Sequence, residues 1–335
     1  MRSTPRFALI RLGLALVLTS ASLARAAVQP YVPDALTLHL WHFDEAAAPA
    51  IDAGTNRLDL PVLAGGATLG NAGYTGFGSA LSTFDSGLTG SPASTDAALS
   101  AFALVNGTGD DTTLNYSNAA TGAFTFEAMI RLDVDLTQTF AGSARGVTPM
   151  QIFSGDSEVN ANRIWQFRID PIGFNPNADG FTSALTAPAL EFINVHNAAA
   201  PIQNRVMPLP LTGPDALTAG AWYHVAVAYD GNDATPNNMS IYWTKVDGTR
   251  TQADLLIQRQ LDTDLPVAAT DFAIGNIGRT TPNGNFLGLI DEVRISETAR
   301  TADQFVFAIP EPGVGGLVGA AVVVGMGVWR RRRRK

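Results

Sequence analysis

The longest regular pattern of hydrophobic and polar positions runs from Phe124 to Leu136. Its apolar positions are Phe124, Phe126, Ala128, Ile130, Leu132, Val134 and Leu136. The positions between them are mostly polar: Thr125, Glu127, Met129, Arg131, Asp133 and Asp135. Because successive side chains of a β-strand point to opposite faces, this alternation predicts an antiparallel strand with one buried face, and it does not fit a helix.

Further short apolar segments follow at close spacing and also predict strands. They are Leu36–Phe43, Arg163–Ile169, Leu190–Val195, Trp222–Tyr229, Ser240–Val246, Phe272–Ile274 and Leu287–Ile295. Extended helical periodicity is hard to find in this part of the chain, and only Thr301–Phe307 suggests a turn of helix. Many short strands without intervening helices predict an all-β fold in which two antiparallel sheets form a sandwich.

The N-terminal 26 residues have the pattern of a secretory signal peptide. Arg2, Arg6 and Arg11 precede the apolar run Leu12–Leu18, and Ala24-Arg25-Ala26 is a small-x-small cleavage site. We therefore expect cleavage after Ala26, and we exclude residues 1–26 from the fold.

The C-terminus, residues 309–335, has three parts. Pro310-Glu311-Pro312 cannot join a helix or a sheet ladder and is expected to stay extended. Residues 313–329 are 17 uncharged residues, the lower limit for a transmembrane helix, and six cations follow from Arg330 to Lys335. This order resembles the PEP-CTERM sorting tail, which implies recognition and cleavage by an exosortase-type membrane enzyme. The alternatives are an ordinary membrane anchor or a buried apolar helix, and the six consecutive cations argue against the second.

Removing both ends changes the charge of the protein. The whole chain carries −8, but four arginines lie in residues 1–26 and six cations follow Pro312, and neither end contains an acid. The remaining 12 cations and 30 acids give the body −18, which argues against nucleic acid or an anionic membrane surface as its partner. The chain has no cysteine, so disulfides, thiolate catalysis and cysteine-ligated zinc are excluded.

Several of these segments together resemble the laminin G-like (LamG), concanavalin A-like jelly-roll domain. The resemblance rests on Leu40-Trp-His-Phe-Asp-Glu45, Phe124–Ile130, Trp222–Gly231, Phe272–Gly275 and Gly288–Ile295. It spans residues 36–307, with Gly87–Gly122 as a loop-rich insertion, and it implies a two-sheet antiparallel jelly roll. The fold serves lectins, adhesion modules, structural proteins and enzymes alike, so it does not specify a function.

Two carboxylates, Asp133 and Asp135, are the candidates for catalysis. Polysaccharide-cleaving relatives often carry a Glu-x-Asp-x-x-Glu strand motif, which is absent here. Asp133 and Asp135 occupy alternate strand positions about 7 Å apart, within the range of inverting glycosidases. The simpler interpretation, a solvated strand end, is favoured because nothing nearby indicates a raised pKa.

A calcium site at Asp44 and Asp291 is a second hypothesis. Asp291 is in phase with Val293 and Ile295, and a carboxylate on an apolar face needs a cation, an arginine or hydrogen-bond donors. The resemblance implies that the first and last strands lie side by side, which would bring Asp44 near Asp291. A hydrogen-bonded or arginine-paired carboxylate is the alternative. Gly109-Asp110-Asp111 and Asp230–Asp233 are further candidates with ordinary turn compositions.

Histidines and aromatic residues offer weaker signals. The histidines are His39, His42, His196 and His224, and the spacing of the first two places them on opposite faces of a strand, so a zinc site is not expected. The chain also lacks the Gly-x-Ser-x-Gly nucleophile elbow. Trp165, Trp222, Tyr242 and Trp243 could stack on sugars, but such residues also fill sandwich cores, which is the favoured interpretation.

The sequence as a whole predicts an exported protein, anchored in the membrane and then displayed at the cell surface or in the extracellular matrix. Its partners are expected to be an exosortase-type sorting enzyme and an extracellular polysaccharide or surface glycan, with calcium as the candidate cofactor. We expect no catalysis. The alternatives are a polysaccharide-active enzyme using Asp133 and Asp135, or a purely structural surface protein.

Overall fold

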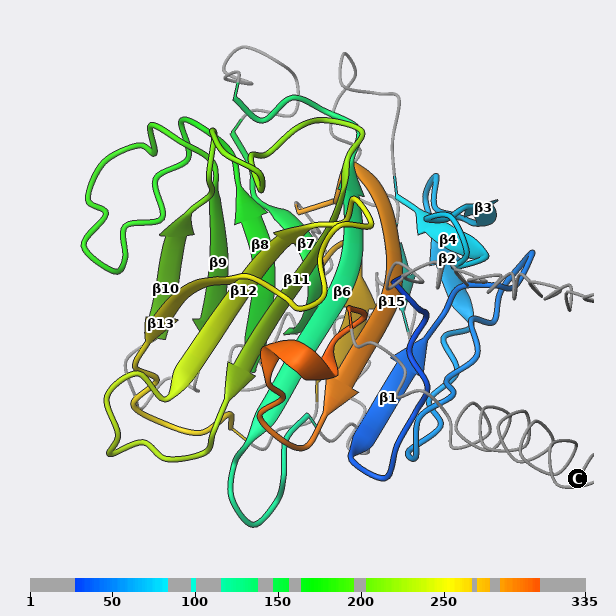
Figure 1. Ribbon diagram of the computed structural model, residues 1–335, viewed down its shortest axis with the longest axis horizontal. Coiled ribbons are helices and arrows are strands. Elements are labelled where there is room, and N and C mark those ends of the chain that lie inside the picture. Colours follow the sequence, from blue (N-terminus) through cyan, green and yellow to red (C-terminus); the bar gives the residue numbers. More distant parts are fainter. Residues whose placement is uncertain are drawn as a thin grey trace, which may run out of the picture.

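The computed structural model describes residues 28–83, 98–100, 116–137, 147–156, 164–195, 203–266, 270–277 and 284–307. Within them the chain forms two antiparallel sheets that pack face to face (Figure 1). The predicted all-β sandwich is therefore confirmed.

The first sheet contains eight of the described strands. Its order is β13 (Leu255–Arg259), β12 (Met239–Lys245), β11 (Trp222–Tyr229), β6 (Phe124–Leu132), β15 (Gly288–Ser296), β4 (Ser79–Ser82) and β3 (Thr68–Ala72), and β1 (Thr37–Trp41) also pairs with β15. The second sheet contains seven: β10 (Gln203–Pro208), β9 (Ala189–Asn194), β8 (Trp165–Asp170), β7 (Met150–Asp156), β14 (Asp271–Ile274), β5 (Ala98–Ser100) and β2 (Val62–Ala64). The first and last predicted strands do lie side by side.

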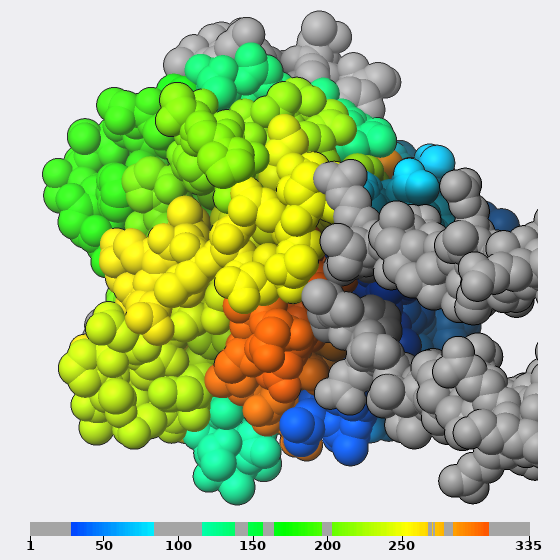
Figure 2. Space-filling view, in the orientation of Figure 1, coloured from blue at the N-terminus to red at the C-terminus, as the bar shows by residue number. Residues whose placement is uncertain are grey.

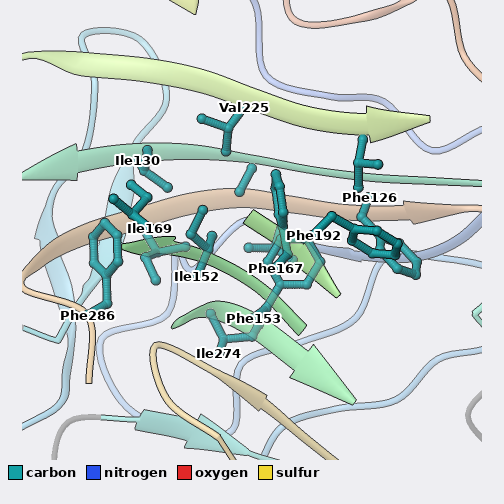
Figure 3. Packing of buried hydrophobic residues seen from close by; sticks show 14 of the residues in the cluster. Phe126, Ile130, Ile152, Phe153, Phe167, Ile169, Phe192, Val225, Ile274 and Phe286 are labelled. Atoms are coloured by element: carbon teal, nitrogen blue, oxygen red, sulfur yellow. The ribbon is translucent and has the colours of Figure 1, made fainter. Parts of the chain in front are cut away.

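The main core fills the space between the sheets (Figure 3). All seven apolar positions predicted for the strand at Phe124 belong to it, although the strand itself ends at Leu132. Phe126 packs against Trp165, with ring centroids 4.2 Å apart. Burying a large apolar side chain of this kind contributes about 1.5–3 kcal/mol, so the alternating pattern accounts for much of the stability of the sandwich.

The outer face of the first sheet is also covered, which the alternation did not predict. The outward side chains Thr125, Glu127 and Met129 of β6 are fully buried. Residues 28–34 and 300–307 lie across them, and the two segments are joined by a hydrogen bond from the Gln29 amide to the Val306 carbonyl (3.0 Å). We call these two segments the terminal clasp. Figures 1 and 2 show its C-terminal half, in orange, on the face of the sheet.

A short 3₁₀ helix, η2 (Ala302–Gln304), lies within the terminal clasp, as the sequence of Thr301–Phe307 suggested. The Gln304 side chain accepts a hydrogen bond from the Thr301 amide (3.0 Å), which satisfies a donor at the start of the turn. The adjoining Phe305, Val306 and Phe307 are buried in a second apolar cluster outside the sandwich. The turn therefore aims three apolar side chains at the sheet.

Both processed ends predicted from the sequence lie outside the described residues. These are the signal peptide with its cleavage site at Ala26, and the tail with Pro310, Glu311, Pro312 and the apolar segment 313–329. Most of the insertion at 87–122 also falls outside, apart from β5 and the residues from Tyr116 onward. Among the residues that the structure describes, no helix is long and apolar enough to cross a membrane.

Candidate functional site

A buried ionic network lies beneath the terminal clasp. Glu127 on β6 accepts a hydrogen bond from Arg294 on β15 (Nε to Oε1, 2.6 Å). Its other carboxylate oxygen accepts from the hydroxyl of Tyr31 and lies 3.3 Å from Nε2 of His224 on β11. The register of the sheet brings these residues together. Glu127 is paired with Arg294 on β15, and on β11 it is paired with Ala226, two residues from His224 on the same face.

Burial and charge shift the pKa values in this network in opposite directions. Burial alone would raise the pKa of Glu127, but the Arg294 charge and the His224 hydrogen bond outweigh it, and the pKa is lowered. Burial lowers the pKa of His224, and the hydrogen bond to Glu127 only partly opposes this effect. The network therefore holds an ionised Glu127 and a neutral His224 at neutral pH.

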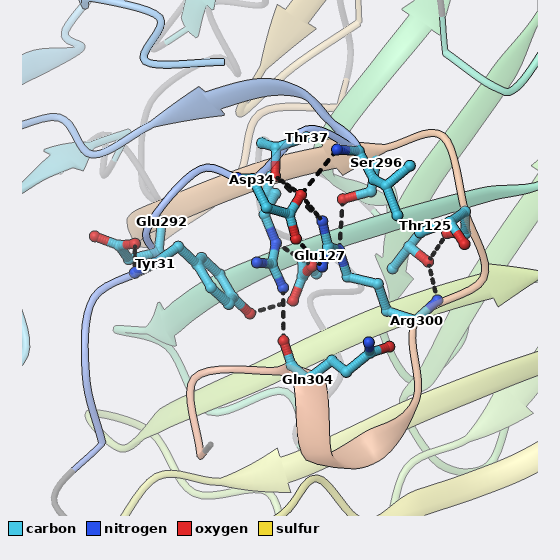
Figure 4. A network of polar contacts seen from close by, with 12 residues as sticks. Tyr31, Asp34, Thr37, Thr125, Glu127, Glu292, Ser296, Arg300 and Gln304 are labelled. Atoms are coloured by element: carbon cyan, nitrogen blue, oxygen red, sulfur yellow. Dashed lines mark hydrogen bonds and ion pairs between the residues drawn. The ribbon is translucent and has the colours of Figure 1, made fainter. Parts of the chain in front are cut away.

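A pocket of about 350 Å³ opens above this network, between the two halves of the terminal clasp. Tyr31, Asp34 and Val32 line it from the N-terminal half, and Arg294, Arg300 and Gln304 line it from the other side. Arg300 binds Asp34 with two hydrogen bonds of 2.8 and 2.9 Å (Figure 4). The pocket therefore combines a fixed carboxylate, two guanidinium groups and an apolar wall.

The structure brings Asp44 and Asp291 to one place, at the turn between β3 and β4. Asp44 accepts a hydrogen bond from the Ser79 amide (2.8 Å), and a Cβ at Gly78 would overlap the Asp44 carboxylate. A Cβ at Gly73 would lie 2.8 Å from Oδ2 of Asp291. Gly73 and Gly78 are themselves hydrogen-bonded (3.1 Å), so the two carboxylates approach the same turn.

The sequence placed Asp291 on the same face of the strand as Val293 and Ile295, and this prediction is wrong. Val293 and Ile295 face the main core, whereas Asp291 is paired with the outward residue Met129. A β-bulge causes the change, because the register shifts between Asp291 and Arg294 and Glu292 adopts a φ of +49°. The Glu292 side chain holds the bulge in place by accepting hydrogen bonds from the Tyr31 amide (2.8 Å) and from Nδ1 of His42 (2.7 Å).

Asp291 nevertheless has an oxygen that fits a cation. Its Oδ1 accepts from the Glu292 amide (2.8 Å), but its buried Oδ2 has no hydrogen-bond partner among the described residues. Burial, with the charges of Glu292 and Asp44, raises the pKa of Asp291 well above its ordinary value. In the described ranges, no group of three or more metal-ligating side chains converges. A calcium ion would therefore have to take its remaining ligands from backbone carbonyls and water.

The candidate catalytic carboxylates have local partners. Asp133 forms two hydrogen bonds with Arg131 (2.8 and 3.1 Å). Asp135 accepts hydrogen bonds from the amide and hydroxyl of Thr137, in an Asx turn beyond the end of β6. These contacts agree with the favoured interpretation, a solvated strand end.

A cluster that sequence reasoning missed lies on the outer face of the second sheet. Arg168 on β8 forms ion pairs with Glu191 on β9 (2.5 Å) and with Asp170 (3.1 Å). Burial and the charge of Glu191 raise the pKa of Asp170 well above its ordinary value. The sequence could have indicated this polar cluster, because Gln166, Arg168 and Asp170 alternate with apolar residues and therefore share one face of the strand.

The candidate stacking residues are all buried. Trp165 and Trp243 belong to the main core, as the favoured interpretation predicts. Trp222 and Tyr242 lie instead in the second apolar cluster, outside the sandwich. His39 binds the buried Asp52 (2.6 Å), while His196 and the Gly109–Asp111 loop lie outside the described residues. Asp230 accepts a hydrogen bond from the Asn232 amide (2.8 Å) as an ordinary turn residue.

The family Laminin_G_3, described as the concanavalin A-like lectin/glucanases superfamily, matches residues 106–305, more than half of the chain. Domain 4 of AbnA, a GH43 extracellular arabinanase from Geobacillus stearothermophilus solved with arabinotriose, is 17% identical, covering 82% of this chain and 97% of that one, with a TM-score of 0.44. The binding domain of botulinum neurotoxin serotype G is 9% identical, with 81% and 50% covered and a TM-score of 0.48. The CBM40 of Ruminococcus gnavus IT-sialidase, bound to α2,3-sialyllactose, is 9% identical, with 56% and 82% covered and a TM-score of 0.37. No curated protein matches the chain.

Proposed function

The chain belongs to the concanavalin A-like lectin/glucanases superfamily, and from that premise we propose that it is a non-catalytic module for glycan binding or adhesion. One observation carries the proposal. The pocket at the terminal clasp, about 350 Å³, brings polar groups together beside an apolar wall. Concave sites of this composition are the usual binding sites of small ligands. The contacts of Asp133 and Asp135 with their own neighbours support a role without catalysis.

A screen of the purified protein on a broad glycan array, with and without calcium, tests the proposal. We expect binding of at least one glycan that is reduced by changes at the pocket. The absence of any bound glycan would leave a purely structural surface protein as the better interpretation.

Polysaccharide cleavage is a second candidate, favoured by two carboxylates, Asp170 and Glu191, that bind the same Arg168 side chain, with the pKa of Asp170 raised by burial. Pairs of carboxylates with different protonation states are what glycoside hydrolysis requires. Both side chains are fully buried, however, which places them out of reach of a polymer. We expect no release of reducing ends from a polysaccharide panel. Turnover lost in Asp170→Asn, or in both Asp133→Asn and Asp135→Asn, would establish an enzyme.

Calcium is the cofactor that we propose, at Asp44 and Asp291. The unpartnered Oδ2 of Asp291 supports it, since calcium accepts carboxylate, carbonyl and water oxygens together. A ligand that binds only the native state stabilises it by about 2.7 kcal/mol at a concentration of 100 Kd. We expect a higher Tm in calcium than in chelator, and no such difference in Asp291→Asn. Equal Tm values in calcium and in chelator for the unmodified protein would contradict a calcium site and indicate that Asp291 is a protonated carboxyl with a structural role.

Export and sorting complete the proposed function. The pattern of residues 1–26 supports secretion, and Pro310-Glu311-Pro312 followed by residues 313–329 and six cations supports recognition by an exosortase-type enzyme. The protein would be held in the membrane through residues 313–329 before processing and would then act at the cell surface or in the extracellular matrix.

A further inference from the structure

Asp34 is the exposed charged group of the pocket at the terminal clasp. Its side chain is 49% exposed, whereas only 4% of the side chain of its partner Arg300 is exposed. Arg294, the second guanidinium group of the lining, is also only 4% exposed and is paired with the buried Glu127. A ligand entering the pocket therefore meets a hydrogen-bond acceptor in front and compensated cations behind it.

The Asp34 carboxylate is held in one orientation before any ligand arrives. Oδ1 accepts hydrogen bonds from the Leu36 amide (3.0 Å), the Thr37 hydroxyl (2.8 Å) and Arg300, and Oδ2 accepts from Arg300. The Arg300 hydrogen bonds hold the pKa of Asp34 well below its ordinary range. A fixed, ionised acceptor loses little side-chain conformational entropy when it binds a donor, which favours affinity.

The charges of the pocket decide between classes of ligand. An anionic ligand would approach the exposed Asp34 carboxylate, while each guanidinium group already has an acid of its own. A metal cation would lie beside the Arg300 guanidinium, which is within 2.9 Å of both Asp34 oxygens. A neutral ligand with hydroxyl groups avoids both conflicts, because a hydroxyl donates to a carboxylate and accepts from a guanidinium.

The wall beside Asp34 suits the apolar face of a sugar ring. Val32 is 80% exposed, although it lines the pocket, and it lies two residues from Asp34. The ring of Tyr31 is covered by the Arg294 guanidinium, 3.6 Å from its centroid, so Val32 is more accessible to a ligand than Tyr31 is. Apolar contact beside a polar acceptor is the arrangement that an amphipathic saccharide needs.

We propose that this pocket binds neutral saccharides, with Asp34 accepting hydrogen bonds from sugar hydroxyls and Val32 contacting the ring. This inference rests on the proposed glycan-binding function and deepens it. It assigns the ligand class and the residues that select it.

The test compares neutral oligosaccharides of glucan, xylan, arabinan and mannan with oligogalacturonate, alginate and sialyllactose, by glycan array and then calorimetry on the full chain. We expect binding of a neutral member, weakened at least about tenfold in Asp34→Asn, since the substitution removes the charge from the hydrogen-bond acceptor. Val32→Ser should weaken it severalfold. Because Val32 is exposed, this variant keeps the test valid where Asp34→Asn fails to fold. Asp262→Asn, which alters an exposed carboxylate paired with Arg205 outside the pocket, is the matched control and should bind normally.

The outcomes separate the two proposals. Preference for the acidic glycans, or neutral binding that both pocket variants retain, overturns the inference and leaves glycan binding intact. No binding of any glycan by the unmodified protein overturns both.

Discussion

Glu127 and His224 share a contact across β6 and β11, and burial gives His224 a defined response to pH. Burial lowers its pKa below the ordinary value of 6.5, and Arg294 acts in the same direction, while Glu127 opposes both. The unfolded chain therefore binds a proton at a higher pH than the folded protein does. The stability that His224 contributes is present in full above about pH 6.5 and is lost as the pH falls below it.

We predict that the free energy of unfolding falls between pH 7.5 and pH 5 in the unmodified protein and falls less in His224→Gln. A tenfold difference in proton affinity between the folded and unfolded states corresponds to about 1.4 kcal/mol. Urea unfolding at both pH values measures the effect. The difference between the two proteins cancels the contributions of the other histidines. Identical pH dependence in the two would show that the pKa of His224 is the same in the folded and unfolded states.

Glu127→Gln tests the ion pair with Arg294 beneath the terminal clasp. The substitution preserves size but leaves the buried guanidinium without a counter-charge, which typically costs about 3–5 kcal/mol. Asp133→Asn is the matched control for stability, since the Arg131–Asp133 pair is partly exposed and pairs of that kind contribute about 0–1 kcal/mol. Equal urea midpoints for the two variants would contradict a structural role for the buried pair.

At the scale of elements, the sequence predicted the apolar strands inside the sheets and missed polar strands at their edges. Trp222–Tyr229 forms the strand that its sequence predicted, because it lies inside the first sheet and every residue except His224 is apolar. Gln203–Pro208 escaped prediction, because this edge strand of the second sheet carries Gln203, Asn204 and Arg205. Its pairing is supplied by β9, which the local sequence does not reveal.

The bulge at Glu292 was equally hidden. Assigning side chains to the two faces by alternation assumes a strand without a bulge. Nothing in Asp291-Glu292-Val293 indicates that one of these residues adopts a positive φ. The partners that fix the bulge, Tyr31 and His42, lie more than 240 residues away in the chain. The expectation that the first and last strands lie side by side is confirmed, because it depended on the order of the strands and not on the phase of one residue.

Phe305 joins the C-terminal half of the terminal clasp to the first sheet. Its ring lies 4.8 Å from that of His224 and 5.1 Å from that of Tyr242, and its side chain is buried. We predict that Phe305→Ala lowers the free energy of unfolding by about 3–5 kcal/mol, the usual cost of truncating a buried aromatic residue. Leu255→Ala, at a half-exposed position of β13, should cost far less. Equal unfolding midpoints for the two variants would show that the burial of Phe305 against the sheet contributes little to stability.

At the scale of the whole molecule, the sequence predicted the sandwich well and the site poorly. The sandwich follows from alternation, which is local. The pocket and the network below it require residues 28–34, β6, β11, β15 and residues 300–307 to meet, and only the folded topology brings them together. Tyr31 and Asp34 gave no signal of their own, because they lie in a short segment before the first strand.

The terminal clasp also bears on how the protein is processed. The hydrogen bond from the Gln29 amide to the Val306 carbonyl places residues 28–34 and 300–307 side by side. Removal of residues 1–26 and cleavage near Pro310-Glu311-Pro312 would both leave the clasp whole. A cut before Phe305 would remove the side chains that cover His224.

We therefore predict a surface-extracted protein whose intact mass corresponds to a start near Ala27 and an end near Pro310-Glu311-Pro312. Its melting temperature should match that of the unprocessed chain. A chain truncated after Arg300 provides the comparison, and it should melt lower because it lacks the buried Phe305, Val306 and Phe307. A mature protein that still carries Arg330–Lys335, extracted from cells that contain an exosortase-type enzyme, would show that residues 313–335 serve as a permanent anchor and not as a sorting signal.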